Sequence, residues 1–168
     1  MIHVCSLARL YATVDETKAR HIVTLLRMTD IVKRPSHIDE KNHLILSMDD
    51  VWVQQDGVTM PGEQHVERLI DFATRWDRST PMVVHCYAGI SRSTAAAFAA
   101  ACALNPQRDE MQIARAIRDA SRTAKPNALI VSMADKLLKR NGRMVRALEA
   151  LGPGQDAEEG IPFRLDLA

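Results

Sequence analysis

The sequence predicts an α/β fold, a small and mainly parallel sheet flanked by helices, and three observations lead to this prediction. Strand-type runs alternate with segments whose apolar residues recur at helical spacing, an order typical of parallel sheets. Residues 21–26 form one continuous run of β-branched and mostly apolar residues, as in a strand that is covered on both faces. Residues 94–102 are small and apolar on nearly every side, which predicts a buried central helix.

In chain order, strands are expected at residues 2–7, 21–26, 42–47 and 81–85. A short helix that runs through Arg20 is expected to begin with Thr13 and Glu16 as a capping box. Residues 61–76 carry apolar side chains at the spacing of one helical face, with a proline in the first turn, where proline is tolerated.

The C-terminal third is expected to be helical. Asp109 can cap one helix and Asn127 another, and a last short helix ends at a Gly-Pro-Gly sequence that begins at Gly152. At 168 residues the chain fits a single domain. We therefore expect one domain over residues 1–151, followed by a linker and tail over residues 152–168 whose end either docks or lies free.

The composition narrows the class of protein. Basic and acidic residues nearly balance, with a net charge of +1, so no general attraction to nucleic acid or membranes is expected. The three cysteines are odd in number and have no metal-ligand spacing, which argues against a disulfide framework. The N-terminus lacks the features of a signal peptide, and the longest apolar run is too short to span a bilayer. We expect a soluble cytoplasmic protein.

The chemistry is concentrated in one stretch, His85-Cys86-Tyr87-Ala88-Gly89-Ile90-Ser91-Arg92-Ser93, between a predicted strand and the buried helix. The spacing of Cys86 and Arg92 suffices for a turn whose N–H groups point inward at a helix N-terminus and bind an anion. Gly89 readily adopts positive φ. Arg92 can donate two parallel hydrogen bonds to an oxyanion, and the positive field favours the Cys86 thiolate. A thiolate beneath an anion cradle is a nucleophile for phosphoryl transfer.

The pattern His85-Cys86-x5-Arg92-Ser93 resembles the signature of the cysteine-dependent protein tyrosine phosphatases, and its internal Ala-Gly is most like the dual-specificity branch. The resemblance implies that the loop amides and Arg92 bind phosphate, and that Ser93 donates a hydrogen bond to the departing thiolate. It also implies that His85 orients the loop and that Asn127 braces it. On the residues alone, a buried structural thiol, a core histidine and a simple N-cap stay open for Cys86, His85 and Asn127.

A second stretch supplies the candidate acid. Protonation of a poor leaving oxygen requires a carboxylic acid on a nearby loop. The hydrophobic-acidic-Asp pattern that the resembling family has after a strand matches Met48-Asp49-Asp50, so Asp50 is the expected acid. Asp49 and Asp56 stay open as alternatives, because the spacing to the cysteine is longer than in many relatives and indicates an insertion near residues 53–57. Otherwise these aspartates are solvated turn or capping residues.

These observations together predict a metal-independent phosphomonoester hydrolase that forms a phosphocysteine intermediate. Cys86 is expected to attack phosphorus, Arg92 and the amides of residues 87–92 to hold the equatorial oxygens, and Asp50 to protonate the leaving group. No metal or cofactor is expected, because the guanidinium and the loop amides supply the positive charge.

The expected substrates are phosphorylated proteins or peptides, with phosphotyrosine first and phosphoserine or phosphothreonine left open. Phosphate and vanadate-like oxyanions are expected to bind the loop. Residues 87–91 include no lysine, which disfavours phosphoinositides. Two alternatives stay open: a catalytically weak phosphate-binding or scaffold module of the same fold, and a phosphatase acting on small molecules or inositol phosphates.

Overall fold

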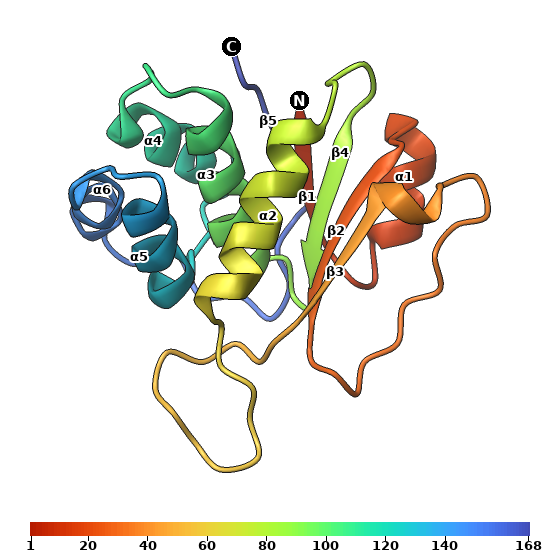
Figure 1. Ribbon diagram of the computed structural model, residues 1–168, viewed down its shortest axis with the longest axis horizontal. Coiled ribbons are helices and arrows are strands. Elements are labelled where there is room, and N and C mark those ends of the chain that lie inside the picture. The colour runs from red at the N-terminus through yellow and green to blue at the C-terminus, as the bar shows by residue number, and fades with distance from the viewer.

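Five strands form one sheet through the middle of the computed structural model, which describes all residues 1–168 (Figure 1). The strands are β1 (Ile2–Ser6), β2 (His21–Leu26), β3 (His43–Ser47), β4 (Met82–Cys86) and β5 (Phe163–Leu165). They lie side by side in the order β3-β2-β4-β1-β5. The first four are parallel, and β5 pairs antiparallel with β1. The predicted α/β fold with a mainly parallel sheet is confirmed.

Helices cover both faces of the sheet. The helices are α1 (Leu10–Thr17), α2 (Glu63–Arg75), α3 (Arg92–Leu104), α4 (Glu110–Ala120), α5 (Ala128–Leu137) and α6 (Arg143–Leu151), with a 3-10 turn at Glu40–Asn42. Figure 1 shows α1 alone on one face and α2 to α6 gathered on the other. The two sides of the sheet therefore enclose two separate apolar layers of unequal size.

The sheet separates these two layers, and the central strand β4 shows how. Met82 and Val84 point into the larger layer, which holds 34 buried residues, whereas Val83 points into the smaller layer beneath α1. Alternate side chains of a strand point to opposite faces, so every residue of a strand covered on both faces is apolar or paired. Every residue of α3 except Ala103 is buried, which confirms the predicted central helix.

The first helix begins earlier than predicted. It starts at Leu10, and Thr13 lies inside it, 6% exposed, without acting as an N-cap. Ser6 makes the turn instead: its carbonyl and its hydroxyl both accept hydrogen bonds from Arg9 N. The predicted capping box was therefore wrong, because the turn that leaves β1 starts the helix before the Thr13 hydroxyl is needed.

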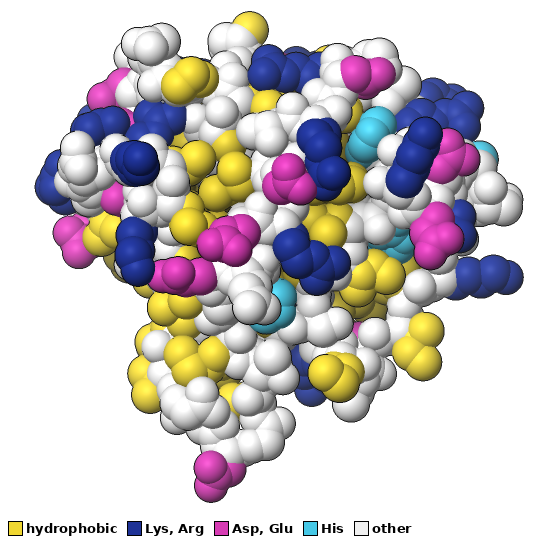
Figure 2. Space-filling model, viewed as in Figure 1, with side chains coloured by type: hydrophobic (Ala, Val, Ile, Leu, Met, Phe, Trp, Pro, Cys, Tyr) yellow, Lys and Arg dark blue, Asp and Glu magenta, His cyan; other side chains and the backbone are white.

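The C-terminal residues dock onto the sheet. Phe163 and Leu165 are buried while Arg164 between them is exposed, the alternation of a strand with one covered face. Residues 152–168, expected as a linker and tail, thus include the antiparallel edge strand of the domain. None of the helices has the length and apolarity that crossing a bilayer requires. On the face seen in Figure 2, basic and acidic side chains are interspersed.

Candidate active site

The loop between β4 and α3 lies where the parallel strands end. All five residues of β4 are buried, so Cys86 enters the loop from a rigid element. The register pairs Ser6 of β1 with Cys86, which places the turn after β1 directly beside the loop. We call residues 86–92 the phosphate loop.

The carbonyl groups of the phosphate loop point outward and are held by other segments. Four of them accept backbone hydrogen bonds: Tyr87 from Leu7 (3.1 Å), Ala88 from Gly160 (2.8 Å), Ile90 from Lys125 (2.9 Å) and Ser91 from Asn127 (3.2 Å). These donors come from three separate parts of the chain. Because the carbonyls are turned out and fixed, the N–H groups between them are turned in.

The inward N–H groups surround the cysteine sulfur. Gly89 N donates to Cys86 Sγ at 3.3 Å, whereas the N–H groups of Tyr87, Ala88, Ile90 and Ser91 make no hydrogen bond within the protein. Gly89 has φ +72°, and a Cβ there would lie 2.8 Å from the backbone of β1. Only glycine fits this position without displacing the strand. The loop is a cluster of convergent donors, the arrangement that binds an oxyanion.

Cys86 is buried beneath this cluster, at 2% exposure. Its sulfur lies 3.1 Å from the hydroxyl oxygen of Ser93, in the first turn of α3. Gly89 N and the Ser93 hydroxyl are thus both placed to donate to a thiolate. At the other two cysteines, burial raises the pKa values of Cys5 and Cys102 to about 12. These two thiols stay protonated at neutral pH.

The guanidinium of Arg92 is held in place and carries an unused donor. Arg92 is 6% exposed, and its Nη1 donates to the carbonyl of Met48 at 2.8 Å. Its Nε is buried and has no hydrogen-bond partner. A buried charged donor without a partner is costly, and an anion in the phosphate loop would satisfy it.

The three candidate aspartates lie in different surroundings on the loop between β3 and α2. Asp50 Oδ1 accepts from the Ser91 hydroxyl at 2.7 Å and from Asn127 Nδ2 at 2.9 Å, so this carboxyl lies against the phosphate loop. Asp49 instead closes the base of its own loop by accepting from Thr59 N at 2.8 Å. Asp56 is exposed and makes no hydrogen bond. Only Asp50 is brought together with the loop.

Asn127 connects the phosphate loop, Asp50 and a helix. Its side-chain oxygen accepts from the N–H groups of Leu129 and Ile130, which confirms the predicted N-cap of α5. Its amide nitrogen donates to Asp50, and its backbone N–H donates to Ser91. N-capping and loop contact, considered as separate possibilities from the sequence, are thus made by one side chain.

His85 is part of a chain of hydrogen bonds that crosses the sheet. His85 Nε2 lies 2.7 Å from the Thr24 hydroxyl, which lies 2.8 Å from His43 Nε2. His85 Nδ1 lies 3.3 Å from the Cys86 carbonyl. Burial, the largest cause, lowers the pKa values of both histidines to about 4, so both rings are neutral at pH 7. A neutral His85 that donates from Nδ1 fixes the carbonyl at the start of the loop.

Sequence reasoning missed three contributors to this arrangement: Thr24, His43 and Gly160. Thr24 gave a usable signal, because a hydroxyl in an otherwise apolar buried strand requires a partner. Gly160 gave none, because nothing local shows which distant peptide it contacts.

Comparisons with known proteins agree with this geometry. A family model described as protein-tyrosine phosphatase matches residues 16–132. The structure of DUSP15 is similar, with a TM-score of 0.62 and 18% identity over 94% of this chain and 94% of that one. PTPMT1 in complex with PI(5)P has a TM-score of 0.61 and 18% identity, over 88% and 94%.

A third similar structure is the Cydia Pomonella PTP-2 phosphatase, with a TM-score of 0.62 and 18% identity over 80% of this chain and 84% of that one. At such identities the likeness establishes a common fold. No curated protein matches the sequence.

Proposed function

The chain belongs to the protein-tyrosine phosphatase family, and from this membership we propose a metal-independent phosphomonoester hydrolase that forms a phosphocysteine intermediate. One observation carries the proposal. The phosphate loop turns four of its carbonyls outward onto fixed donors and leaves four N–H groups and the buried Arg92 Nε without partners around Cys86. Such preorganised donors stabilise the charge that develops on transferred phosphoryl oxygens.

In the first step the Cys86 thiolate attacks phosphorus. The S–P bond forms as the P–O bond to the leaving group breaks, and the loop amides with Arg92 hold the three equatorial oxygens. Asp50 gives its proton to the leaving oxygen. Because Ser91 and Asn127 both bind Oδ1, Oδ2 is the oxygen free for this transfer.

In the second step a water molecule attacks the phosphocysteine. Its oxygen bonds to phosphorus as the S–P bond breaks, and Asp50 takes the proton that the water loses. The Ser93 hydroxyl, 3.1 Å from the sulfur, donates to the thiolate as it leaves. The products are inorganic phosphate and the enzyme in its starting form.

The substrate we favour is a phosphorylated protein or peptide. Residues 87–91 of the loop include no lysine or arginine that would meet a second phosphate. A groove of about 440 Å³ adjoins the loop, lined by Leu7, Ala8, Tyr87, Ala88, Glu158 and Glu159. Its glutamates repel polyanionic inositol phosphates, whereas its apolar floor accommodates peptide side chains. PTPMT1 was solved with PI(5)P, so phosphoinositides are the competing class.

We place the activity in a reducing compartment, the cytoplasm. All three cysteines are free and buried. A thiolate nucleophile persists where thiols are kept reduced.

The test is hydrolysis of p-nitrophenyl phosphate by the wild type and by Cys86→Ser, in the presence of EDTA. We expect turnover that survives EDTA and is abolished by the substitution, with phosphate still bound by the variant. A freshly reduced wild type that binds vanadate without turnover would point to the binding module instead. Release of phosphate from a phosphotyrosine peptide and from PI(5)P then separates the two substrate classes.

A further inference from the structure

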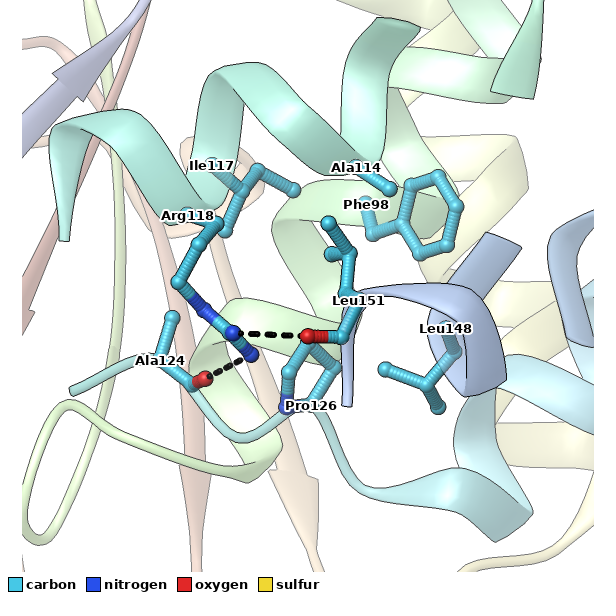
Figure 3. Close-up of a pocket in the computed structure, with 8 residues that line it drawn as sticks. All are labelled: Phe98, Ala114, Ile117, Arg118, Ala124, Pro126, Leu148 and Leu151. Atoms are coloured by element: carbon cyan, nitrogen blue, oxygen red, sulfur yellow. Dashed lines mark hydrogen bonds between the residues drawn. The ribbon is translucent and has the colours of Figure 1, made fainter. Parts of the chain in front are cut away.

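The segment after α6 returns to the sheet between two anchors. Arg118 of α4 holds its start, donating to the carbonyls of Leu151 (3.1 Å) and Gly152 (2.9 Å) and to Ala124 (3.1 Å). Figure 3 shows the Arg118 side chain reaching between Leu151 and Ala124. At the other end β5 pairs with β1. We call residues 152–165 the C-terminal strap.

Between its anchors the strap touches the phosphate loop at one buried residue. Residues 155–159 are exposed, whereas Gly160 is buried, and its N–H donates to the Ala88 carbonyl at 2.8 Å. A Cβ on Gly160 would lie 2.8 Å from the carbonyl oxygen of Gly89. Real Cβ atoms do not approach backbone this closely, so the strap and the loop are in contact without spare room.

Gly89 is therefore enclosed from two directions. A Cβ added to Gly89 would meet the backbone of Cys5 and Ser6, while Gly160 covers the Gly89 carbonyl. The residue next to Gly160 adds a second link, because Glu159 accepts a hydrogen bond from the Ser6 hydroxyl at 2.6 Å. Ser6 is 1% exposed and is the register partner of Cys86.

We propose that Gly160 and Glu159 are positioning residues for the phosphate loop. The strap holds the Gly89 peptide in the orientation that directs the Gly89 N–H at Cys86 Sγ and the other loop N–H groups at the anion. The inference rests on the proposed function for its kinetic consequence. Glu159 and Gly160 lie outside residues 16–132, the part that the family model matches, so membership of the family does not assign them this role. Displacement of reacting groups by about 1 Å can slow a reaction about 10²-fold.

The test compares two glycine substitutions in the full chain. Gly160→Ala forces the strap and the Gly89 peptide apart, and we expect kcat/KM for p-nitrophenyl phosphate and the affinity for vanadate to fall about ten- to a hundred-fold. Gly142→Ala is the matched control, because Gly142 lies outside the strap, has φ +79°, and its added Cβ would meet only the end of the Arg146 side chain. It destabilises the fold through backbone conformation, and we expect both readouts within about twofold of wild type.

Two results would overturn the proposal. One is a folded Gly160→Ala variant that keeps wild-type turnover and vanadate affinity. The other is an equal loss in Gly142→Ala at a matched melting temperature, which would trace the loss to general destabilisation. A wild type that binds vanadate without turnover would contradict the proposed function alone, and vanadate affinity would still decide the role of the strap.

If Gly160→Ala does not fold, Glu159 provides the second comparison. Glu159→Ala and Glu159→Gln both remove the negative charge, but only Glu159→Gln keeps an oxygen acceptor for the Ser6 hydroxyl. We therefore expect Glu159→Ala to bind vanadate about threefold to tenfold more weakly than Glu159→Gln. Equal affinities in these two variants would overturn the positioning role.

Discussion

Oδ1 of Asp50 accepts two hydrogen bonds while Oδ2 of the same carboxyl accepts none. Asp49 and Asp56 differ from it in kind, since one closes the base of the loop and the other makes no hydrogen bond. Because the three aspartates differ in their contacts, substituting each in turn tests which one is the acid.

Replacing Asp50 by alanine is expected to slow phosphotyrosine peptides far more than p-nitrophenyl phosphate. A tyrosine phenolate is a poor leaving group that needs the proton, so its kcat/KM should fall by about 10² or more. Nitrophenolate leaves more easily, so its loss should be smaller. Steady-state rates for both substrates, over a pH series, measure the difference.

Asp56→Ala is the control, since Asp56 is an exposed aspartate of the same loop, and we expect its rates within about twofold of wild type. If Asp50→Ala left the tyrosine ester unaffected, Asp50 would not be the acid. Asp49→Ala would then be measured next.

The residues of the phosphate loop could be proposed from sequence because their chemistry is local. Cys86 and Arg92 are six positions apart on one turn between a strand and a helix. The hydrogen bonds that hold the loop are not local: Leu7, Lys125 and Gly160 donate to it from distant parts of the chain. Backbone donors carry no residue-type signal, so no reading of side-chain chemistry could have found them.

At the scale of elements, Asn127 joins the start of α5 to Asp50 and to the phosphate loop. Its oxygen caps the helix and its amide nitrogen holds Asp50. Because the two functions use different atoms of one side chain, two substitutions can separate them.

Asn127→Ser keeps a capping oxygen but is too short to reach Asp50, whereas Asn127→Ala removes both functions. We expect Asn127→Ala to lose about 1 kcal/mol of unfolding free energy, and Asn127→Ser to lose less than half of that. Both should lose activity toward phosphotyrosine peptides. Urea denaturation and steady-state kinetics on the same preparations measure the two effects.

Asp109 provides the control, because its carboxylate caps α4 by accepting from Gln112 N at 3.1 Å, away from the phosphate loop. Asp109→Ala should lose about as much stability as Asn127→Ala while keeping its activity. If Asn127→Ser retained full activity, the contact with Asp50 would have no part in the reaction.

Sequence predicted the elements well where one signal was sufficient. The continuous strands and the buried helix α3 were predicted correctly because nearly every position in them carries an apolar or small side chain. The predicted start of α1 was wrong. Thr13 and Glu16 match the sequence pattern of a capping box, but the turn at Ser6 begins the helix earlier. The strand β5 has three residues, too few for a periodic pattern to identify it.

At the scale of the whole molecule, burial lowers the pKa values of most of the histidines. Five of the six, His3, His21, His43, His65 and His85, have pKa values that burial lowers below the ordinary value. They lie on β1, β2, β3, α2 and β4, so the effect is distributed over the sheet and its flanking helix. The folded protein consequently binds fewer protons than the unfolded chain between pH 6.5 and about 4.

The unfolding free energy is therefore expected to fall as the pH is lowered from 7 to 5. In the unfolded chain the histidines bind protons with pKa values near 6.5, whereas in the folded protein they stay neutral to lower pH. Lowering the pH therefore favours the unfolded state. For His85, whose pKa is about 4, the loss by pH 5 is about 2 kcal/mol. The half-buried His43 adds less, because solvent screens it, and urea denaturation at pH 7, 6 and 5 measures the sum.

One variant assigns part of the slope to a histidine of the sheet rather than to acid in general. His43→Gln removes one titrating ring, so the stability lost between pH 7 and pH 5 should be smaller than in wild type. Burial is the largest cause of the lowered pKa of His85, and charge repulsion from His43 and Arg92 lowers it further. A slope that His43→Gln leaves unchanged would contradict the contribution of His43.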